Sequence, residues 1–252
     1  MLLCIDIGNT NTVLATFDKD KIVHSWRVKT DARNTADELG LMFRGLLAND
    51  NVELTGVAAC STVPMALRSL RSMLQRYYGH LPTVILEPGV KTGVQLAIDN
   101  PKEVGTDRVA NTLAAYTLFG GPSIVVDFGT STNFDVVSAR GEFLGGVLAP
   151  GIEISVEALA SRAAQLRKVE LVKPPRIIGK NTVECLQSGV VYGFAGQVDG
   201  IVRGIISETG PVQAVIATGG LASVVLAECQ TVTHHEPMLT LIGLRHIFER
   251  NV

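Results

Sequence analysis

Short apolar runs separated by turn residues occupy the first thirty positions, a pattern typical of β-strands. We expect strands over residues 2–7, 13–17 and 22–28. Apolar residues then recur at helical spacing behind Thr35-Ala-Asp-Glu, which has the form of a capping box, a hydroxyl followed three positions later by a carboxylate. The chain is therefore expected to begin with a three-stranded meander that leads into an amphipathic helix ending near Asn49.

The rest of the chain alternates apolar strands with amphipathic helices. Further strands are expected over residues 57–60, 83–86, 123–127 and 133–137. A turn at Arg140-Gly141 is expected to lead into another strand that ends at Val147, and a later strand is expected over 214–217. Further helices are expected from Pro64, over 106–119, from about Gly151, from a second capping-box form at Asn181-Thr-Val-Glu towards Thr209, and over 240–250. Three strands followed by helix, strand, helix, strand and helix thus occur twice, which is typical of two α/β domains.

The two halves also repeat a short sequence. Asp6-Ile-Gly-Asn-Thr-Asn-Thr and Asp127-Phe-Gly-Thr-Ser-Thr-Asn each follow an apolar strand and precede a second strand, and their aspartates are 121 positions apart. A separation of about half the chain predicts a duplication. The expected fold is α/β, with duplicated domains over residues 1–120 and 121–252 and a cleft between them.

Composition limits the classes of function. The chain has 252 residues, of which 46 % are hydrophobic and 18 % charged, and its formal net charge is −2. We therefore expect no nucleic-acid partner and no membrane partner, because both require a basic surface or, for a membrane span, an apolar run of about 18 residues. The N-terminus has no basic segment before a long apolar one, which predicts no signal peptide and a cytoplasmic protein.

The cysteines and histidines give no pattern of metal ligands. Cys4, Cys60, Cys185 and Cys229 are scattered without a Cys-x-x-Cys pair, and we interpret them as small buried thiols. His234-His235-Glu236 is interpreted as a solvated loop, because adjacent side chains rarely converge on one ion.

The strand-turn-strand corner at Asp6 suits the binding of a phosphate. Gly8 lets phosphate oxygens approach the backbone, and the amides and hydroxyls that follow supply donors. The Asp6 carboxylate suits Mg²⁺, which prefers carboxylate oxygens, water and substrate phosphates. The same residues also suit a plain hairpin whose Asp and Asn satisfy turn amides, so a single corner leaves both interpretations open.

The second corner, at Asp127, favours the ligand-binding interpretation. Two such corners can hold one polyphosphate from both sides, and Thr218-Gly-Gly at the end of a late strand can lie against a nucleoside. A duplicated core without a ligand would show the same repeat, and this stays the structural alternative. Neither the P-loop sequence nor a Gly-x-Gly-x-x-Gly after a strand occurs, which excludes the P-loop and Rossmann interpretations.

Seven stretches of sequence together resemble one family. They are DIGNTNT at 6–12, DNPKEVGTDR at 99–108, DFGTSTNFD at 127–135, GGVLAPGIEIS at 145–155, SRAAQL at 161–166, GKNTVECLQSGVVYG at 179–193 and ATGGLA at 217–222. In this order they resemble the type III pantothenate kinases, which belong with acetate and sugar kinases, heat-shock chaperone ATPases and actin. The resemblance implies two actin-like (ribonuclease H-like) domains with a nucleotide cleft between them. It also implies transfer of the γ-phosphoryl group of ATP to the primary hydroxyl of pantothenate, the first step of coenzyme A biosynthesis.

The resemblance implies that Asp107 is the general base that accepts the proton of the pantothenate hydroxyl. The alternative is a first-turn acid that complements a helix N-terminus capped by Thr106. Gly105, Thr106 and Arg108 belong to the implied substrate segment. Arg108 suits an anionic group, although an exposed ion pair is the commoner use of arginine. Thr182 matches the substrate threonine of the family, with a plain helix cap as its alternative.

The remaining matched residues are implied to bind nucleotide and cations. Asp127 matches the ligand of a monovalent cation, K⁺ or NH₄⁺, and Asp6 is the expected Mg²⁺ ligand. The implied ATP contacts are Asp6, Ile7, Gly8, Asn9, Thr10, Asn11, Thr12, Val13, Thr130, Gly219 and Gly220. The family also implies a homodimer with the vitamin pocket near the subunit interface.

The sequence departs from the family pattern at three places. Thr106 replaces the common alanine of the substrate segment, Thr130-Ser-Thr-Asn-Phe-Asp replaces the common TATTFD, and Ile98 stands where an aromatic residue often precedes the Asp-Asn-Pro turn. The missing ring puts one substrate contact in doubt. Two rival functions remain: a nucleotide-binding accessory factor of a transcriptional regulator, which would have no need of Asp107, and a sugar or acetate kinase, which GKNT and VGTDR do not support.

Overall fold

The computed structural model describes residues 1–49, 52–162 and 169–252. The chain divides into two compact units. The first comprises Met1–Val94, Asp99–Ala114 and Leu239–Val252, and the second comprises Gln95–Ile98 and Ala115–Met238. The last segment of the chain thus belongs with the first unit. The boundary of the duplication near residue 120 stays a prediction.

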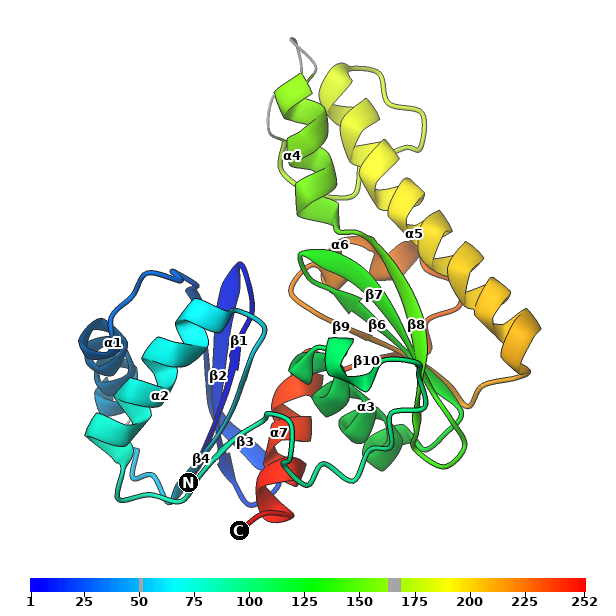
Figure 1. Ribbon diagram of the computed structural model, residues 1–252. Coiled ribbons are helices and arrows are strands. Elements are labelled where there is room, and N and C mark those ends of the chain that lie inside the picture. Colours follow the sequence, from blue (N-terminus) through cyan, green and yellow to red (C-terminus); the bar gives the residue numbers. More distant parts are fainter. Residues whose placement is uncertain (50–51, 163–168) are drawn as a thin grey trace. The chain divides into compact units, whose positions relative to one another are not determined.

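The first unit is built on a mixed five-stranded sheet in the order β3-β2-β1-β4-β5 (Figure 1). Its strands are β1 (Leu2–Ile7), β2 (Asn11–Asp18), β3 (Lys21–Lys29), β4 (Gly56–Ser61) and β5 (Thr83–Ile85). Its helices are α1 (Ala36–Asn49), α2 (Pro64–Tyr78), the short 3₁₀ helix η1 (Pro101–Glu103), the first part of α3 (Thr106–Phe119), and α7 (Leu239–Glu249). The first three strands form the antiparallel meander predicted from the sequence, and β4 and β5 extend the sheet in parallel.

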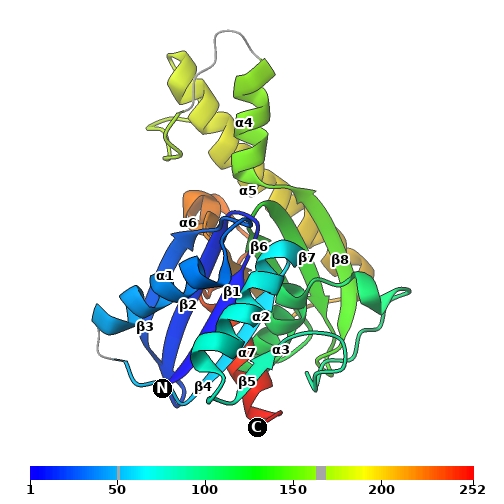
Figure 2. The same ribbon diagram turned by 60° about the vertical axis from the view of Figure 1, so that its left-hand side comes forward.

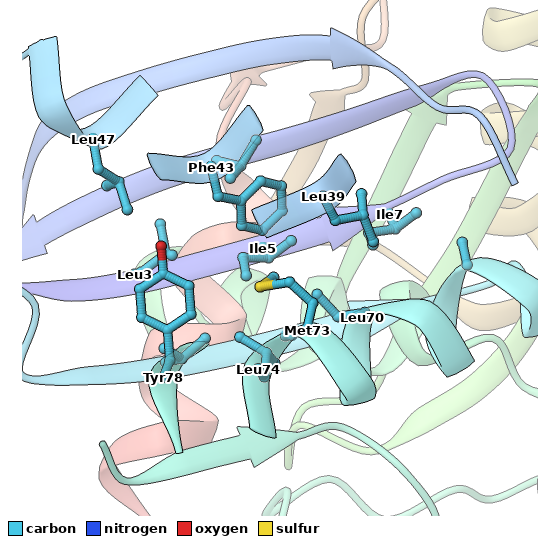
Figure 3. Packing of buried hydrophobic residues seen from close by; sticks show 14 residues of the cluster. Leu3, Ile5, Ile7, Leu39, Phe43, Leu47, Leu70, Met73, Leu74 and Tyr78 are labelled. Carbon is cyan, nitrogen blue, oxygen red and sulfur yellow. The ribbon is translucent and has the colours of Figure 1, made fainter. Parts of the chain in front are cut away.

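The core of the first unit lies between one face of this sheet and helices α1 and α2 (Figure 3). Alternate residues of β1, Leu3, Ile5 and Ile7, point to this side, as the period of two in a strand requires. The predicted capping box starts α1: the Glu38 amide donates to Thr35 Oγ1 at 3.3 Å, and the Thr35 amide donates to Glu38 Oε2 at 2.7 Å. The end of β1 that leads into the first corner is therefore supported by the packed layer of α1 and α2.

Helix α7 contacts β1 and β4 and packs closely against α3. Gly243 of α7 lies against the α3 backbone, where a Cβ would overlap the carbonyl oxygen of Ala110. We expect Gly243→Ala to lower the free energy of unfolding by about 1–3 kcal/mol, because the helices would have to separate. Gly45 of α1 has open space around it, so Gly45→Ala is expected to raise stability by about 0.5–1 kcal/mol. Urea denaturation measures the free energy of unfolding of both variants. Equal changes in the two variants would contradict the close packing of α7 against α3.

The second unit repeats the first. Its strands are β6 (Ser123–Phe128), β7 (Ser131–Val137), β8 (Phe143–Pro150), β9 (Ala214–Thr218) and β10 (His234–His235). Its helices are α4 (Ile152–Arg162), α5 (Thr182–Thr209), α6 (Ala222–Val225) and the 3₁₀ helix η2 (Leu226–Glu228). The strand order of its sheet is β10-β9-β6-β7-β8. Written from the opposite edge, β8-β7-β6-β9-β10, this order corresponds strand for strand to β3-β2-β1-β4-β5 of the first unit. The predicted fold of two duplicated α/β domains is confirmed.

Two interpretations of the sequence are wrong. His234 and His235 do not lie in a loop, because they pair in parallel with Ile216 and Ala217 as edge strand β10. Cys185 is exposed on α5 rather than buried. Residues 163–166 of the SRAAQL stretch lie outside the described residues. Within the three described ranges, no helix has both the length and the apolar character needed to cross a membrane.

Candidate active site

The first corner is a tight turn between β1 and β2. Asp6 pairs with Val13 and Ile7 with Thr12, and the Gly8 amide donates to the Asn11 carbonyl oxygen at 3.0 Å, which closes the turn. The tip, at Asn9 and Thr10, is exposed. Every residue assigned to the phosphate loop, Asp6 to Val13, therefore lies on this one corner.

Asp6 lies at the end of β1 beside β4 and α3. Cys60 Sγ of β4 donates to Asp6 Oδ1 at 3.3 Å. The pKa of Asp6 is raised to about 7: burial and the negative charge of Asp107 raise it, and the Cys60 hydrogen bond and Arg27 lower it in part. The structure thus brings together the predicted Mg²⁺ ligand and the predicted general base, two carboxylates from segments about a hundred residues apart in sequence.

Asp107 stands in the first turn of α3. The carbonyl oxygen of Gly105 accepts from the amides of Arg108 at 3.1 Å and Val109 at 3.3 Å, so Gly105 begins the helical hydrogen bonding. Asp107 Oδ1 accepts from the Arg108 amide at 2.9 Å. Burial raises the pKa of Asp107, and the Arg108 amide and guanidinium lower it in part. The helix thus orients the carboxylate and leaves it a better proton acceptor than an exposed aspartate.

The alternative in which Thr106 caps this helix does not hold. The Thr106 hydroxyl oxygen is buried and has no hydrogen-bond partner in the described part of the chain. It lies instead close enough to the Cys60 thiol to lower the pKa of that group. The first-turn role of Asp107 is real, since its carboxylate accepts a backbone amide, and this role is compatible with catalysis because it fixes the side chain.

Gly105 makes room for the Asp107 carboxylate. A Cβ on Gly105 would overlap Asp107 Oδ1, whereas its next neighbour, Thr62 Cγ2, would lie at 3.7 Å. Because only the end of one side chain must move, we expect Gly105→Ala to fold with a melting temperature near that of the wild type. Since displacement of a reacting group by about 1 Å costs up to about 10²-fold in rate, we expect kcat to fall by about 10- to 100-fold. Steady-state kinetics combined with thermal denaturation tests this, and unchanged kcat would contradict the assigned position of the base.

The second corner repeats this geometry in the second unit. Asp127 pairs with Asn133 of β7 and with Thr218 of β9, and the Gly129 amide donates to the Ser131 carbonyl oxygen at 3.0 Å. Gly219 has φ +91, and a Cβ on it would overlap Asp127 Oδ1 and the Phe128 backbone. The sequence Thr-Gly-Gly therefore folds directly against the corner aspartate, a close approach that only glycine permits.

Two other predicted residues, Thr130 and Thr182, hold different positions within the second unit. The Thr130 carbonyl oxygen accepts from the Gly151 amide at 3.1 Å, which joins the corner to the start of α4. Thr182 is the first residue of α5 and is exposed. Asn181 Oδ1 is the cap, accepting from the Glu184 amide at 2.9 Å, so the Thr182 side chain is not needed for it. Figures 1 and 2 show the start of α5 beside α4, away from the sheet of the second unit.

Cys60 is the site residue that the sequence analysis missed. Its signal was weak, because a cysteine in a buried apolar strand is usually a packing residue. The available clue is register: a parallel strand that follows the first corner brings its last residues beside Asp6. No group of three or more potential metal ligands occurs among the described residues.

Comparison with known proteins identifies the family. A family model for type III pantothenate kinase matches residues 2–204. The chain is 76 % identical over 252 residues to the type III pantothenate kinase of Salinispora arenicola (strain CNS-205), with 100 % of both chains covered. It is 65 % identical over 252 residues to that of Frankia alni (strain DSM 45986 / CECT 9034 / ACN14a), again over 100 % of both.

A solved structure extends the likeness of fold. Component A of (R)-2-hydroxyglutaryl-CoA dehydratase from Acidaminococcus fermentans aligns with a TM-score of 0.58 at 14 % identity, covering 99 % of this chain and 98 % of the other. At that identity the likeness concerns the two duplicated domains alone. The family match and the full-length relatives show that this chain belongs to the type III pantothenate kinase family.

Proposed function

We propose that this protein transfers the γ-phosphoryl group of ATP to the primary hydroxyl of pantothenate, with Asp107 as the general base. The observation that carries the proposal is the pair of carboxylates, Asp6 and Asp107, in the first unit of a chain of this family. Asp107 would accept the proton of the hydroxyl as the new P–O bond forms. Its raised pKa supports this role, because burial makes the carboxylate more basic.

Asp6 is proposed to hold Mg²⁺ together with water and the phosphates of ATP. The residues fit this ion, because a single carboxylate with substrate oxygens is the usual protein contribution to a Mg²⁺ site. The pKa of Asp6 is raised mainly by burial and also by the charge of Asp107, so a cation beside Asp6 would favour its ionised form. Bound Mg²⁺ would offset the charge of the β- and γ-phosphates, while the turn between Ile7 and Val13, which is exposed at Asn9 and Thr10, would supply backbone donors.

The second unit is proposed to contribute contacts to the nucleotide and a monovalent cation. Asp127 would hold K⁺ or NH₄⁺, and Thr130, Gly219 and Gly220 would contact ATP. The cradle that Gly219 forms against the Asp127 carboxylate supports this assignment, since a side chain there would fill it. A cation at this point would help to replace the lysine that a P-loop provides.

The substrate is proposed to meet the segment Gly105 to Arg108 and Thr182. Arg108 would pair with the carboxylate of pantothenate or with the transferred phosphoryl group, for which its planar guanidinium is suited. Thr182 is exposed at the start of a helix and is available for contact with a ligand or a second chain. Ile98 replaces an aromatic contact, so part of the vitamin pocket would differ from the common family form.

A homodimer is proposed for the working enzyme. Large exposed hydrophobic residues gather on β8, α4 and the region at the start of α5; they are Leu144, Val147, Leu148, Ile154, Leu159, Ile177, Ile178 and Val183. An exposed apolar surface of this kind favours association.

We expect light scattering to give a mass near twice the 26.9 kDa of one chain. Leu148→Asp is expected to shift it towards one chain, because Leu148 is 65 % exposed and a charge would remain uncompensated in an apolar interface. Leu41→Asp is the control, since Leu41 is 63 % exposed on α1 of the first unit. A monomeric wild type would contradict the dimer.

The decisive assay couples ADP release to pantothenate phosphorylation in the presence of Mg²⁺, with K⁺, NH₄⁺ or Na⁺ as the monovalent cation. Formation of phosphopantothenate tests the kinase activity, and failure with every cation would overturn it. Loss of most of the activity in Na⁺ supports the Asp127 site, whereas equal rates in K⁺ and Na⁺ would contradict it. Glucose and acetate as acceptors test the rival kinases, and we expect no turnover with either.

A cytoplasmic location is proposed because ATP is available there and the four cysteines are unpaired.

A further inference from the structure

Strands β1 and β4 place a cysteine directly beside the Asp6 carboxylate. Asp6 and Cys60 are partners in the parallel register of these strands although they are 54 positions apart, and Cys60 Sγ donates to Asp6 Oδ1 at 3.3 Å. Cys60 has no exposed surface. Because a change of partner would require the whole strand to shift register, the sheet itself fixes this contact.

The thiol is the donor of this contact and the carboxylate is the acceptor. A cysteine thiol ordinarily loses its proton only at a pH of about 8.5, so a thiol has a proton to donate at neutral pH. A protonated thiol beside a carboxylate donates a weak hydrogen bond, which restrains the rotation of the carboxylate without neutralising its charge.

The residues that follow Cys60 lie beside the first turn of α3. A Cβ on Gly105 would lie 3.7 Å from Thr62 Cγ2, and Thr62 is two positions after Cys60. The end of β4 that carries Cys60 therefore approaches the segment that contains the proposed base, Asp107.

The duplication supplies an independent parallel. In the second unit Thr218 of β9 is the register partner of Asp127, as Cys60 of β4 is the partner of Asp6. Thr218 is 2 % exposed. In both halves, therefore, a small buried side chain that can donate a hydrogen bond is the register partner of the corner aspartate. The residues that precede Cys60 in β4 and Thr218 in β9 are apolar.

We propose that Cys60 is a positioning residue of the kinase, whose thiol orients the Asp6 carboxylate for Mg²⁺. The inference rests on the proposed function, because it takes Asp6 as the Mg²⁺ ligand. A cysteine that only fills the core would contribute to stability and would leave the response to Mg²⁺ unchanged.

Three variants separate positioning from packing. Cys60→Ala removes the donor, Cys60→Ser retains one, and Cys4→Ala is the matched control, because Cys4 lies in β1 and is as buried as Cys60. The measurements are the Mg²⁺ concentration for half-maximal activity, the KM for pantothenate and the melting temperature. We expect Cys60→Ala to raise the half-maximal Mg²⁺ concentration by about five- to tenfold, as the loss of one weak hydrogen bond to a charged group implies.

The other variants are expected to respond differently. Cys60→Ser should stay within about twofold of the wild type in its Mg²⁺ dependence, since its hydroxyl is also a donor. Cys4→Ala should lose stability and keep the wild-type Mg²⁺ dependence. Where Cys60→Ala does not fold, Cys60→Val keeps the volume without a donor and gives the same comparison with serine.

Two results would overturn the inference. One is an unchanged Mg²⁺ dependence in Cys60→Ala, with only the loss of stability seen in Cys4→Ala. The other is equal impairment of the alanine and serine variants, which would show that the donor is not the cause. Asp6→Asn separates this inference from the proposed function: if that variant retains the wild-type Mg²⁺ dependence, the Mg²⁺ role of Asp6 itself is wrong, whatever Cys60 does.

Discussion

Asp107→Asn is expected to lower kcat by about 10²- to 10⁴-fold, the usual contribution of a general base. The asparagine keeps the shape of the side chain, and its carbonyl oxygen can still accept the Arg108 amide that Asp107 Oδ1 accepts at 2.9 Å. The start of α3 should therefore be preserved. What is lost is the ability to take a proton from the pantothenate hydroxyl, so we expect the KM for ATP to change little.

Glu103→Gln provides the control for this variant. Glu103 is an exposed carboxylate in η1, shortly before the substrate segment, and it accepts from Asn100 Nδ2 at 2.6 Å. Its replacement is expected to leave kcat near the wild-type value. A wild-type kcat in Asp107→Asn would show that the assigned base is wrong. It would also leave the accessory-factor function open, since a nucleotide-binding regulator has no need of this carboxylate.

The local elements were predictable because their signals are local. Thr35 and Glu38 are three positions apart, and the capping box that this spacing predicts is formed. The strand pairs at the two corners follow from the repeated Asp-x-Gly sequence, which closes a tight turn in each unit. These features need only neighbouring residues, so the pattern of the chain contains them.

The features that were not predictable depend on contacts across long separations. The two residues of β10 become a strand only because β9 offers them an edge, and no apolar run marks them. The C-terminal helix belongs with the first unit because Gly243 fits against Ala110. The thiol of Cys60 meets Asp6 through the register of two parallel strands. Such pairings follow from tertiary packing, which overrides local preference.

The Asp6 carboxylate itself is expected to destabilise the ligand-free protein at neutral and alkaline pH. Its pKa is about 7 in the folded chain, mainly through burial, against 3.8 for an exposed aspartate such as that of the unfolded chain. Between these values the folded state binds the additional proton, so the free energy of unfolding falls as the pH rises from about 4 to about 7 and stays lower above that range. At about 1.4 kcal/mol per pKa unit, the cost is on the order of 4 kcal/mol at pH 8.

Asp6→Asn should therefore raise the melting temperature of the ligand-free protein at pH 8, on the order of 5–10 °C, and change it little at pH 4. Asp20→Asn, in the exposed turn between β2 and β3, is the control and should change the melting temperature at neither pH.

Addition of Mg²⁺ and ATP should stabilise the wild type and fail to stabilise Asp6→Asn, since a ligand stabilises only the state that binds it. Thermal denaturation at both pH values measures all of these changes. Equal melting temperatures of wild type and Asp6→Asn at pH 8 would contradict the buried, charged carboxylate. The proposed function would give this gain in stability a reason: a cation bound at Asp6 during phosphoryl transfer would supply the positive charge that the buried carboxylate lacks in the ligand-free protein.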